Sequence, residues 1–412
     1  MRCLVLRPEI ALILVVSGTV GYGHSVQVDA PPPPPWTDDL QAAADANNRF
    51  ALDLYAKLRE TPGNVFLSPY SVHTALAMTT TGTKGVTRDE MVKVLHLPAD
   101  EGRVPAAGDL GRYYGHPRKE FSLSVANALW GQKGLPWRAE FLTLQKGRFG
   151  ASLHEADFAT NHEADRLHIN KWVEDKTRDR VRELLKPGSI TPQTVMVLAN
   201  AIHFKGTWKT KFDPTRTRDA TFHLADDTTA TVPLMYVNAK ARNGIVSDPV
   251  NRKLITRVLE LPYTGGELSL VVILPALPDG LPAVERQLTA ETLKTWIAGL
   301  RETQLGVSLP RFKQEQAFSL PEQLKALGMV RAFGAGADFT GMLDSGGISI
   351  SAVQHKAFVE VNEEGTEAAA ATAVTGEKSP DPIPFVADHP FLFLIRDARH
   401  GTILFLGRVE QP

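Results

Sequence analysis

The most constraining feature of this sequence is a tract of very small residues that directly follows an apolar run near the C-terminus. The run ISAVQHKAFVEV (350–361) has the length and composition of a buried strand, and residues 365–373 then read GTEAAAATA. Such small side chains bury too little apolar surface to anchor a core. A short helix capped by Thr366 is one interpretation, because alanine is the best helix former. A helix of about eight residues without an apolar face is marginal alone, so we expect the tract to act through something other than its own packing.

Apolar runs elsewhere in the sequence predict strands. VMVLANAIHF (195–204) and ELSLVVILP (267–275) are almost continuously apolar, which is typical of strands that are covered on both faces. Near the C-terminus, FLFLIRD (391–397) and TILFLGRV (402–409) are separated by the turn residues ARHG. These two runs predict a closing hairpin.

Helices are predicted from apolar residues spaced three and four apart. This spacing covers residues 38–58 and 167–185, and Pro187-Gly188 is expected to end the second helix. A third helix is expected to begin at Ser319-Leu320-Pro321 and to end at Gly328. Because helices dominate the first half and strands the second, we predict one large α+β domain over residues 40–412.

Charge balance and missing motifs exclude several classes of function. The net charge is −1 and 22% of the residues are charged, so we expect no nucleic-acid partner and no membrane surface. The sequence contains no GxSxG, HExxH or Walker motif, and HEADRLH (162–168) does not place both histidines on one helical face. We therefore predict that the protein is not an enzyme and has neither a metal site nor a cofactor.

The N-terminal segment has the pattern of a signal peptide. Arg2 and Arg7 precede the apolar run IALILVV, and the small residues GYG precede His24. Residues 1–23 are therefore predicted to be a signal peptide and residues 24–39, with five consecutive prolines, a stiff proline-rich linker. On this prediction the protein is secreted or extracellular, and a periplasmic location stays open.

Several motifs in their order along the chain resemble the serpin family. These are NVFLSPYSV (64–72), INKWVEDKTRDRV (169–181), VLANAIHFKGTWKTKFDP (197–214), LPRFKQE (309–315) and HKAFVEVNEEGTEAAAATA (355–373), and ADHPFLFLIRD (387–397) follows them. The resemblance implies an α+β fold of three β-sheets and eight or nine helices, with an exposed reactive-centre loop near the C-terminus. In this family a protease cleaves the loop, stays attached as a covalent acyl complex, and is displaced when the loop inserts into the central sheet as a new strand.

The small residues suit a segment that must insert between existing strands. Alternate side chains of an inserted strand face the interior, and from Thr366 to Thr372 every second residue is small and uncharged. Gly365 supplies a turn with little steric restriction. The resemblance therefore implies a monomeric suicide inhibitor of serine proteases, with a non-inhibitory binding or carrier protein as the alternative. The predicted loop hinge comprises Glu363, Glu364, Gly365, Thr366, Glu367, Ala368, Ala369, Ala370, Ala371 and Thr372.

The family spacing places the reactive bond at one of two positions. Counting sixteen residues from Glu363 gives Lys378-Ser379, and counting seventeen gives Ser379-Pro380. We predict Lys378-Ser379, because proline is unfavourable on the leaving side and lysine suits the acidic pocket of a trypsin-like protease. A cysteine or elastase-like target is the alternative.

Further residues resemble those that support opening of the central sheet in this family. A buried polar cluster beneath the opening, a tryptophan at its top and an ion pair between Arg311 and Glu363 are expected. The predicted supporting residues are Ser68, Ser71, Asn200, Trp208, Arg311 and His355. Only scattered basic residues, such as Arg112 and Arg118, precede Phe121, so we expect no requirement for a polyanion.

Overall fold

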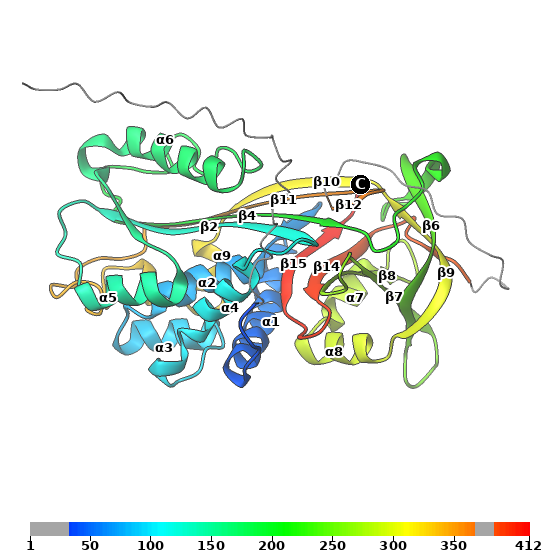
Figure 1. Cartoon of the computed structure of the whole chain (residues 1–412), viewed down its shortest axis with the longest axis horizontal. Coiled ribbons are helices and arrows are strands. Elements are labelled where there is room, and N and C mark those ends of the chain that lie inside the picture. Colours follow the sequence, from blue (N-terminus) through cyan, green and yellow to red (C-terminus); the bar gives the residue numbers. More distant parts are fainter. Residues whose placement is uncertain (1–32, 367–382) are drawn as a thin grey trace, which may run out of the picture. The chain divides into compact units, whose positions relative to one another are not determined.

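The structure is a computed structural model that describes residues 33–366 and 383–412 (Figure 1). The predicted signal peptide, the first part of the predicted linker and the predicted reactive bond lie outside the described residues, so their predictions stand untested.

A six-stranded sheet carries the site described below. The helix α6 (Phe158–Lys176) covers one face of this sheet, and α2 (Pro69–Thr80) lies on the other face (Figure 1). The strand order is β10 (Phe312–Ser319), β11 (Ala352–Asn362), β12 (Gly365–Thr366), β4 (Met196–Thr207), β2 (Phe121–Gln132) and β3 (Leu153–Ala156).

A nine-stranded sheet contains the remaining strands. Its order is β1 (Val65–Leu67), β15 (Ile403–Val409), β14 (Phe391–Asp397), β8 (Leu268–Pro275), β7 (Leu254–Pro262), β6 (Thr229–Ser247), β9 (Arg301–Pro310) and β13 (Phe385–Val386), and β5 (Arg218–His223) pairs with β6. The long strand β6 pairs with β5, β7 and β9. Two of the three sheets that the resemblance implied are therefore continuous through β6. The predicted hairpin is present as antiparallel β14 and β15.

Nine α-helices occur in the described part of the chain. Besides α2 and α6 they are α1 (Asp38–Leu58), α3 (Gly85–Val94), α4 (Ala106–Gly115), α5 (Ala139–Leu144), α7 (Leu281–Gln287), α8 (Ala290–Ala298) and α9 (Pro321–Ala326). The predicted α+β class with eight or nine helices is confirmed. The helices predicted over 38–58 and from Pro321 are α1 and α9, and Gly328 follows α9 with φ +112°.

One predicted helix is displaced by nine residues toward the C-terminus. The helix expected over 167–185 is α6, which begins at Phe158 and ends at Lys176. Thr177 ends it, because its hydroxyl bonds to the carbonyl of Val173 and accepts the N–H of Val181. Val181 and Leu185 are nevertheless buried, since the segment after α6 packs back onto the sheet.

Strand β4 confirms that an almost continuous apolar run is covered on both faces. Leu198 packs into the cluster on the side of α2, whereas Val197 and Ala199 belong to the cluster beneath α6. This double burial leaves no solvent-facing side for polar residues over most of the strand.

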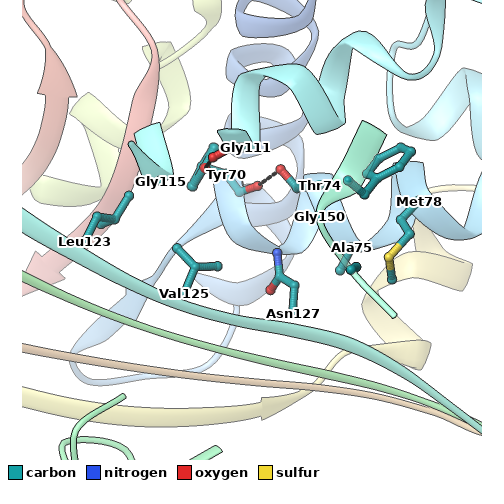
Figure 2. Close-up of a pocket in the computed structure, with 12 residues that line it drawn as sticks. Tyr70, Thr74, Ala75, Met78, Gly111, Gly115, Leu123, Val125, Asn127 and Gly150 are labelled. Atoms are coloured by element: carbon teal, nitrogen blue, oxygen red, sulfur yellow. Dashed lines mark hydrogen bonds between the residues drawn. The ribbon is translucent and has the colours of Figure 1, made fainter. Parts of the chain in front are cut away.

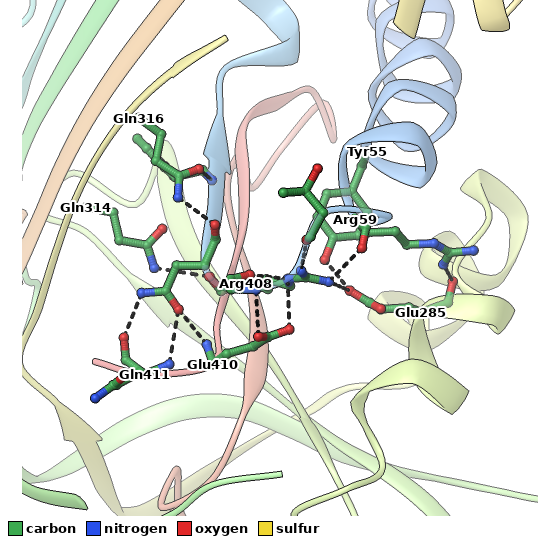
Figure 3. A network of polar contacts seen from close by, with 12 residues as sticks. Tyr55, Arg59, Glu285, Gln314, Gln316, Arg408, Glu410 and Gln411 are labelled. Atoms are coloured by element: carbon green, nitrogen blue, oxygen red, sulfur yellow. Dashed lines mark hydrogen bonds and ion pairs between the residues drawn. The ribbon is translucent and has the colours of Figure 1, made fainter. Parts of the chain in front are cut away.

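A polar network fixes the C-terminal strand to two helices (Figure 3). The buried Arg408 of β15 pairs with Glu285 of α7 at 3.3 Å, and it donates to the carbonyl of Gly63 at 2.7 Å. Glu285 also accepts a hydrogen bond from Tyr55 of α1 at 2.5 Å. Because both charges are paired and hydrogen-bonded, the network can be buried without leaving an unpaired ion.

Candidate functional site

The candidate site is the end of the six-stranded sheet where the predicted hinge enters it. After β11 the chain turns back at once, and β12 pairs antiparallel with both β11 and β4. Farther along, β11 and β4 pair directly with each other as parallel strands, from Ala352 opposite Val197 to Phe358 opposite His203. Thus two residues of the hinge lie between these strands at one end, while the rest of the sheet is closed.

Gly365 occupies a position that accommodates no side chain. Its φ is +152°, and an added Cβ would lie 2.0 Å from the carbonyl oxygen of Gly206. This backbone conformation and this close approach both favour glycine. The turn into β12 therefore depends on Gly365.

Aromatic residues form the wall beside β12. Thr366 is fully buried, and its hydroxyl lies 2.8 Å from that of Tyr263. Trp208 stacks on Tyr263 at 4.7 Å, and its indole N–H donates to the carbonyl of Asn362 at 2.8 Å. The backbone N–H of Trp208 also donates to the carbonyl of Glu364. Trp208 therefore lies at the point where the hinge enters the sheet.

Two ion pairs hold the turn. The guanidinium Nε of Arg311 lies 2.8 and 2.9 Å from the two carboxylate oxygens of Glu363, and Lys211 lies 2.6 Å from Glu364. Burial acts to raise the pKa of Glu363, but the hydrogen bonds from Arg311 and Thr217 outweigh it and lower the pKa. The carboxylate thus stays ionised and fixes the turn to the junction of β9 and β10 and to the segment before β5.

A buried polar cluster lies beneath the closed part of the sheet. The ring of His355 on β11 bonds to Asn200 on β4, whose amide contacts Ser71 of α2 and Asn127 of β2. The backbone N–H of Ser68 donates to His355 Nε2 at 3.0 Å. Sequence reasoning placed four of these residues together and missed Asn127.

The hydrogen bonds define the tautomer of His355. Because Nε2 accepts the N–H of Ser68, Nδ1 carries the proton and donates to Asn200. Burial lowers the pKa of His355 to about 3, so the ring is neutral. A neutral histidine here connects β11, β4 and α2.

One sequence signal pointed to Asn127. Asn127 lies on β2 between Val125 and Leu129. The three residues follow one another at a spacing of two, so their side chains face the same side of the strand, as Figure 2 shows for Val125 and Asn127. A polar residue in such an apolar set needs a hydrogen-bond partner when it faces the interior. The partner, Asn200, lies on another strand, so spacing alone did not identify it.

The structure places each described candidate residue as follows. Glu363 to Thr366 form the turn and β12, and Ser68, Ser71, Asn200, Trp208, Arg311 and His355 lie in the contacts given above. The remaining hinge residues, Glu367, Ala368, Ala369, Ala370, Ala371 and Thr372, and the reactive-bond residues Lys378, Ser379 and Pro380 lie outside the described residues. Roles in inhibition stay predictions for both groups.

Comparison with known proteins agrees with the sequence resemblance. A family described as serpin (serine protease inhibitor) matches residues 45–412. The leukocyte elastase inhibitors of Sus scrofa and Homo sapiens are each 41% identical to this chain, and the alignments cover 90% of this chain and all of the relatives. The crystal structure of uncleaved ovalbumin superposes with a TM-score of 0.82 at 30% identity, over 90% of this chain and all of ovalbumin.

The predicted secreted or extracellular location, with its periplasmic variant, is wrong in the light of these relatives. The leukocyte elastase inhibitors are intracellular proteins that lack a signal peptide. Their alignments with this chain cover the relatives from end to end and cover 90% of this chain. No helix among the described residues is both long enough and apolar enough to cross a membrane.

Proposed function

Because this chain belongs to the serpin family of serine protease inhibitors, we propose that it traps its target protease by loop cleavage and insertion. In this mechanism the protease cuts the loop after Lys378 and remains attached as an acyl enzyme. The hinge then continues β12 as a full strand between β11 and β4. The position of β12 between these strands is the single observation that supports this direction of insertion most strongly.

The energetics favour insertion once the loop is cut. Insertion replaces one parallel pairing with two antiparallel edges, and each new bond contributes about 0.5–1.5 kcal/mol net. A strand of about twelve residues thus gains on the order of 10 kcal/mol, and its far end moves about 40 Å. The intact protein is therefore a kinetically trapped state with a missing strand.

The proposed target is a trypsin-like serine protease. Lys378 suits an acidic specificity pocket, and Ser379-Pro380 is the alternative bond. An elastase-like protease is the second candidate, because the relatives from Sus scrofa and Homo sapiens are named leukocyte elastase inhibitors. The sequence Ala373-Val374-Thr375 offers small residues for such a pocket.

The test is incubation of the purified protein with trypsin and, separately, with leukocyte elastase. A complex that survives denaturing gel electrophoresis is expected with trypsin, and mass spectrometry of the released peptide should place the cut after Lys378. Lys378→Ala should abolish the trypsin complex, whereas Lys146→Ala, at an exposed lysine in the turn that follows α5, should not.

Two other results would redirect the proposal. A stable complex with elastase alone would favour the second target class. Clean cleavage without a complex, and without a rise in the melting temperature, would favour the non-inhibitory binding or carrier alternative. We also propose that the uncomplexed protein is a monomer, which sedimentation analysis tests directly.

A further inference from the structure

An arginine of β7 contacts the chain on the leaving side of the predicted reactive bond. Arg257 donates from Nη1 to the carbonyl of Pro384 at 2.8 Å and from Nη2 to the carbonyl of Ile383 at 3.2 Å. Its guanidinium carbon also lies 5.1 Å from the centre of the Phe385 ring. One side chain therefore contacts three consecutive residues of the segment that leads into β13.

The sheet fixes Arg257 in place for these contacts. Its backbone pairs with Ile245 of β6 on one side and with Leu274 of β8 on the other. The side chain is half-buried, and burial lowers the pKa of Arg257. No carboxylate pairs with it among the described residues. The two carbonyls and the ring face thus compensate a cation that has lost part of its hydration.

Little else holds the two residues whose carbonyls Arg257 contacts. The side chains of Ile383 and Pro384 are exposed, so packing contributes little to fixing them. Phe385 is fully buried and begins β13, which has two residues and pairs with β9 at the end of the nine-stranded sheet. Without Arg257 the chain would be fixed only from Phe385 onward, and Ile383 and Pro384 would be free to move.

The predicted bond is close enough to feel this change. Lys378 precedes Ile383 by five residues, which span at most about 18 Å of extended chain. Residues 379–384 read SPDPIP, with proline at every second position from 380. Proline restricts backbone rotation, so a sequence of this kind transmits an orientation better than a glycine-rich one does.

We propose that Arg257 is a positioning residue for cleavage of the reactive loop, because it fixes the leaving side of the bond and so presents that bond to the protease in one orientation. The proposal rests on the proposed function. The hinge side is fixed independently, by Gly365 and Thr366 between β11 and β4. Loss of Arg257 should therefore weaken binding of the loop by the protease and leave the rate of insertion from the hinge unchanged.

The test follows complex formation over a range of trypsin concentrations, which separates the half-saturating concentration from the limiting rate. Arg257→Ala should raise the half-saturating concentration by about fivefold or more, as expected when one further residue must be ordered on binding. Its limiting rate should stay within about twofold of the parent's. Arg257→Lys keeps the charge but cannot reach both carbonyls with a planar fork, so it should lie between the two. Arg286→Ala, at an exposed arginine of α7, is the matched control and should behave as the parent does.

Each outcome decides the role of Arg257. An unchanged or lower half-saturating concentration in Arg257→Ala overturns the proposal. So does a limiting rate that falls in proportion, because that result indicates a structural role only. If the parent is cleaved in the loop without forming a complex, the proposed trapping fails, but a raised KM for cleavage with an unchanged kcat still supports Arg257. Absence of any cut between Thr366 and Ile383 contradicts both proposals.

Discussion

Acidification is expected to destabilise this protein through His355, whose surroundings strongly disfavour a second proton on the ring. Nε2 already accepts the N–H of Ser68 at 3.0 Å, and Nδ1 donates to Asn200. A proton on Nε2 would set two donors against each other in a fully buried site. Burial accordingly lowers the pKa of His355 to about 3.

The size of this loss of stability follows from the difference in proton binding by His355 between the native and the unfolded state. An unfolded histidine has a pKa of about 6.5, so below that pH the unfolded state binds a proton that the native His355 does not. The free energy of unfolding therefore falls with decreasing pH, by about 1.4 kcal/mol per unit, until the native pKa of about 3 is reached. Between pH 7.5 and 4.5 the loss from His355 is about 2.7 kcal/mol.

His73 contributes in the same direction. It is also buried, burial lowers its pKa to about 4, and its Nε2 bonds to the carbonyl of Leu95 at 2.9 Å. Its stabilising effect is likewise present near neutral pH and is lost as the pH falls from about 6.5 toward 4. The parent protein should therefore lose stability from both sites on acidification.

The assay is urea unfolding at pH 7.5 and pH 4.5 for the parent protein and for His355→Gln. The variant is expected to be less stable at pH 7.5, because Ser68 and Asn200 lose a partner. The decisive quantity is the change between the two pH values, which should be about 2.7 kcal/mol smaller in the variant. His223→Gln, at an exposed histidine, should retain the parent's pH dependence. An unchanged pH dependence in His355→Gln refutes the reasoning.

Three further substitutions test the hinge. Thr366→Arg would bring a charge into a fully buried position. This variant should be cleaved by the protease without forming a stable complex. Thr366→Ser keeps the hydroxyl and should still form the complex. Arg311→Ala leaves the carboxylate of Glu363 without its guanidinium partner and should lower the free energy of unfolding in urea by about 1 kcal/mol. Adding Glu363→Gln to the same chain should restore part of this stability. Gly365→Ala should displace β12, because the added Cβ would lie 2.0 Å from Gly206, and a melting temperature equal to the parent's would contradict this.

The strands were predictable because their signal is local and strong. The apolar run over 195–204 became β4, whose side chains are buried on both faces. The helix over 167–185 was predicted wrongly beyond Lys176 because apolar spacing reports burial and not backbone conformation. Leu185 is buried, but its backbone N–H is held by the side chain of Asn170 in place of a helical carbonyl.

The candidate site was predictable only with the family resemblance. Ser68, Asn200 and His355 are far apart in sequence, and no local pattern states that they meet. Asn127 shows the limit, because its partner lies on the neighbouring strand and register is a property of the whole sheet. The entry of Gly365 and Thr366 between β11 and β4 likewise depends on contacts with Trp208, and sequence spacing does not encode them.

Strand register connects the hinge to the polar cluster. In β12, Thr366 is opposite Val361 on β11 and Gly206 on β4, and each further inserted residue in the same register takes the next position on both strands. On the proposed insertion, the first parallel pair to part is Phe358 with His203, and the fourth is His355 with Asn200. In this register the residue that comes between His355 and Asn200 is Thr372. Its hydroxyl both donates and accepts, so it can replace the hydrogen bond that the two side chains lose. We infer that the cluster resists early opening of the sheet and that the second threonine of the hinge compensates for its disruption.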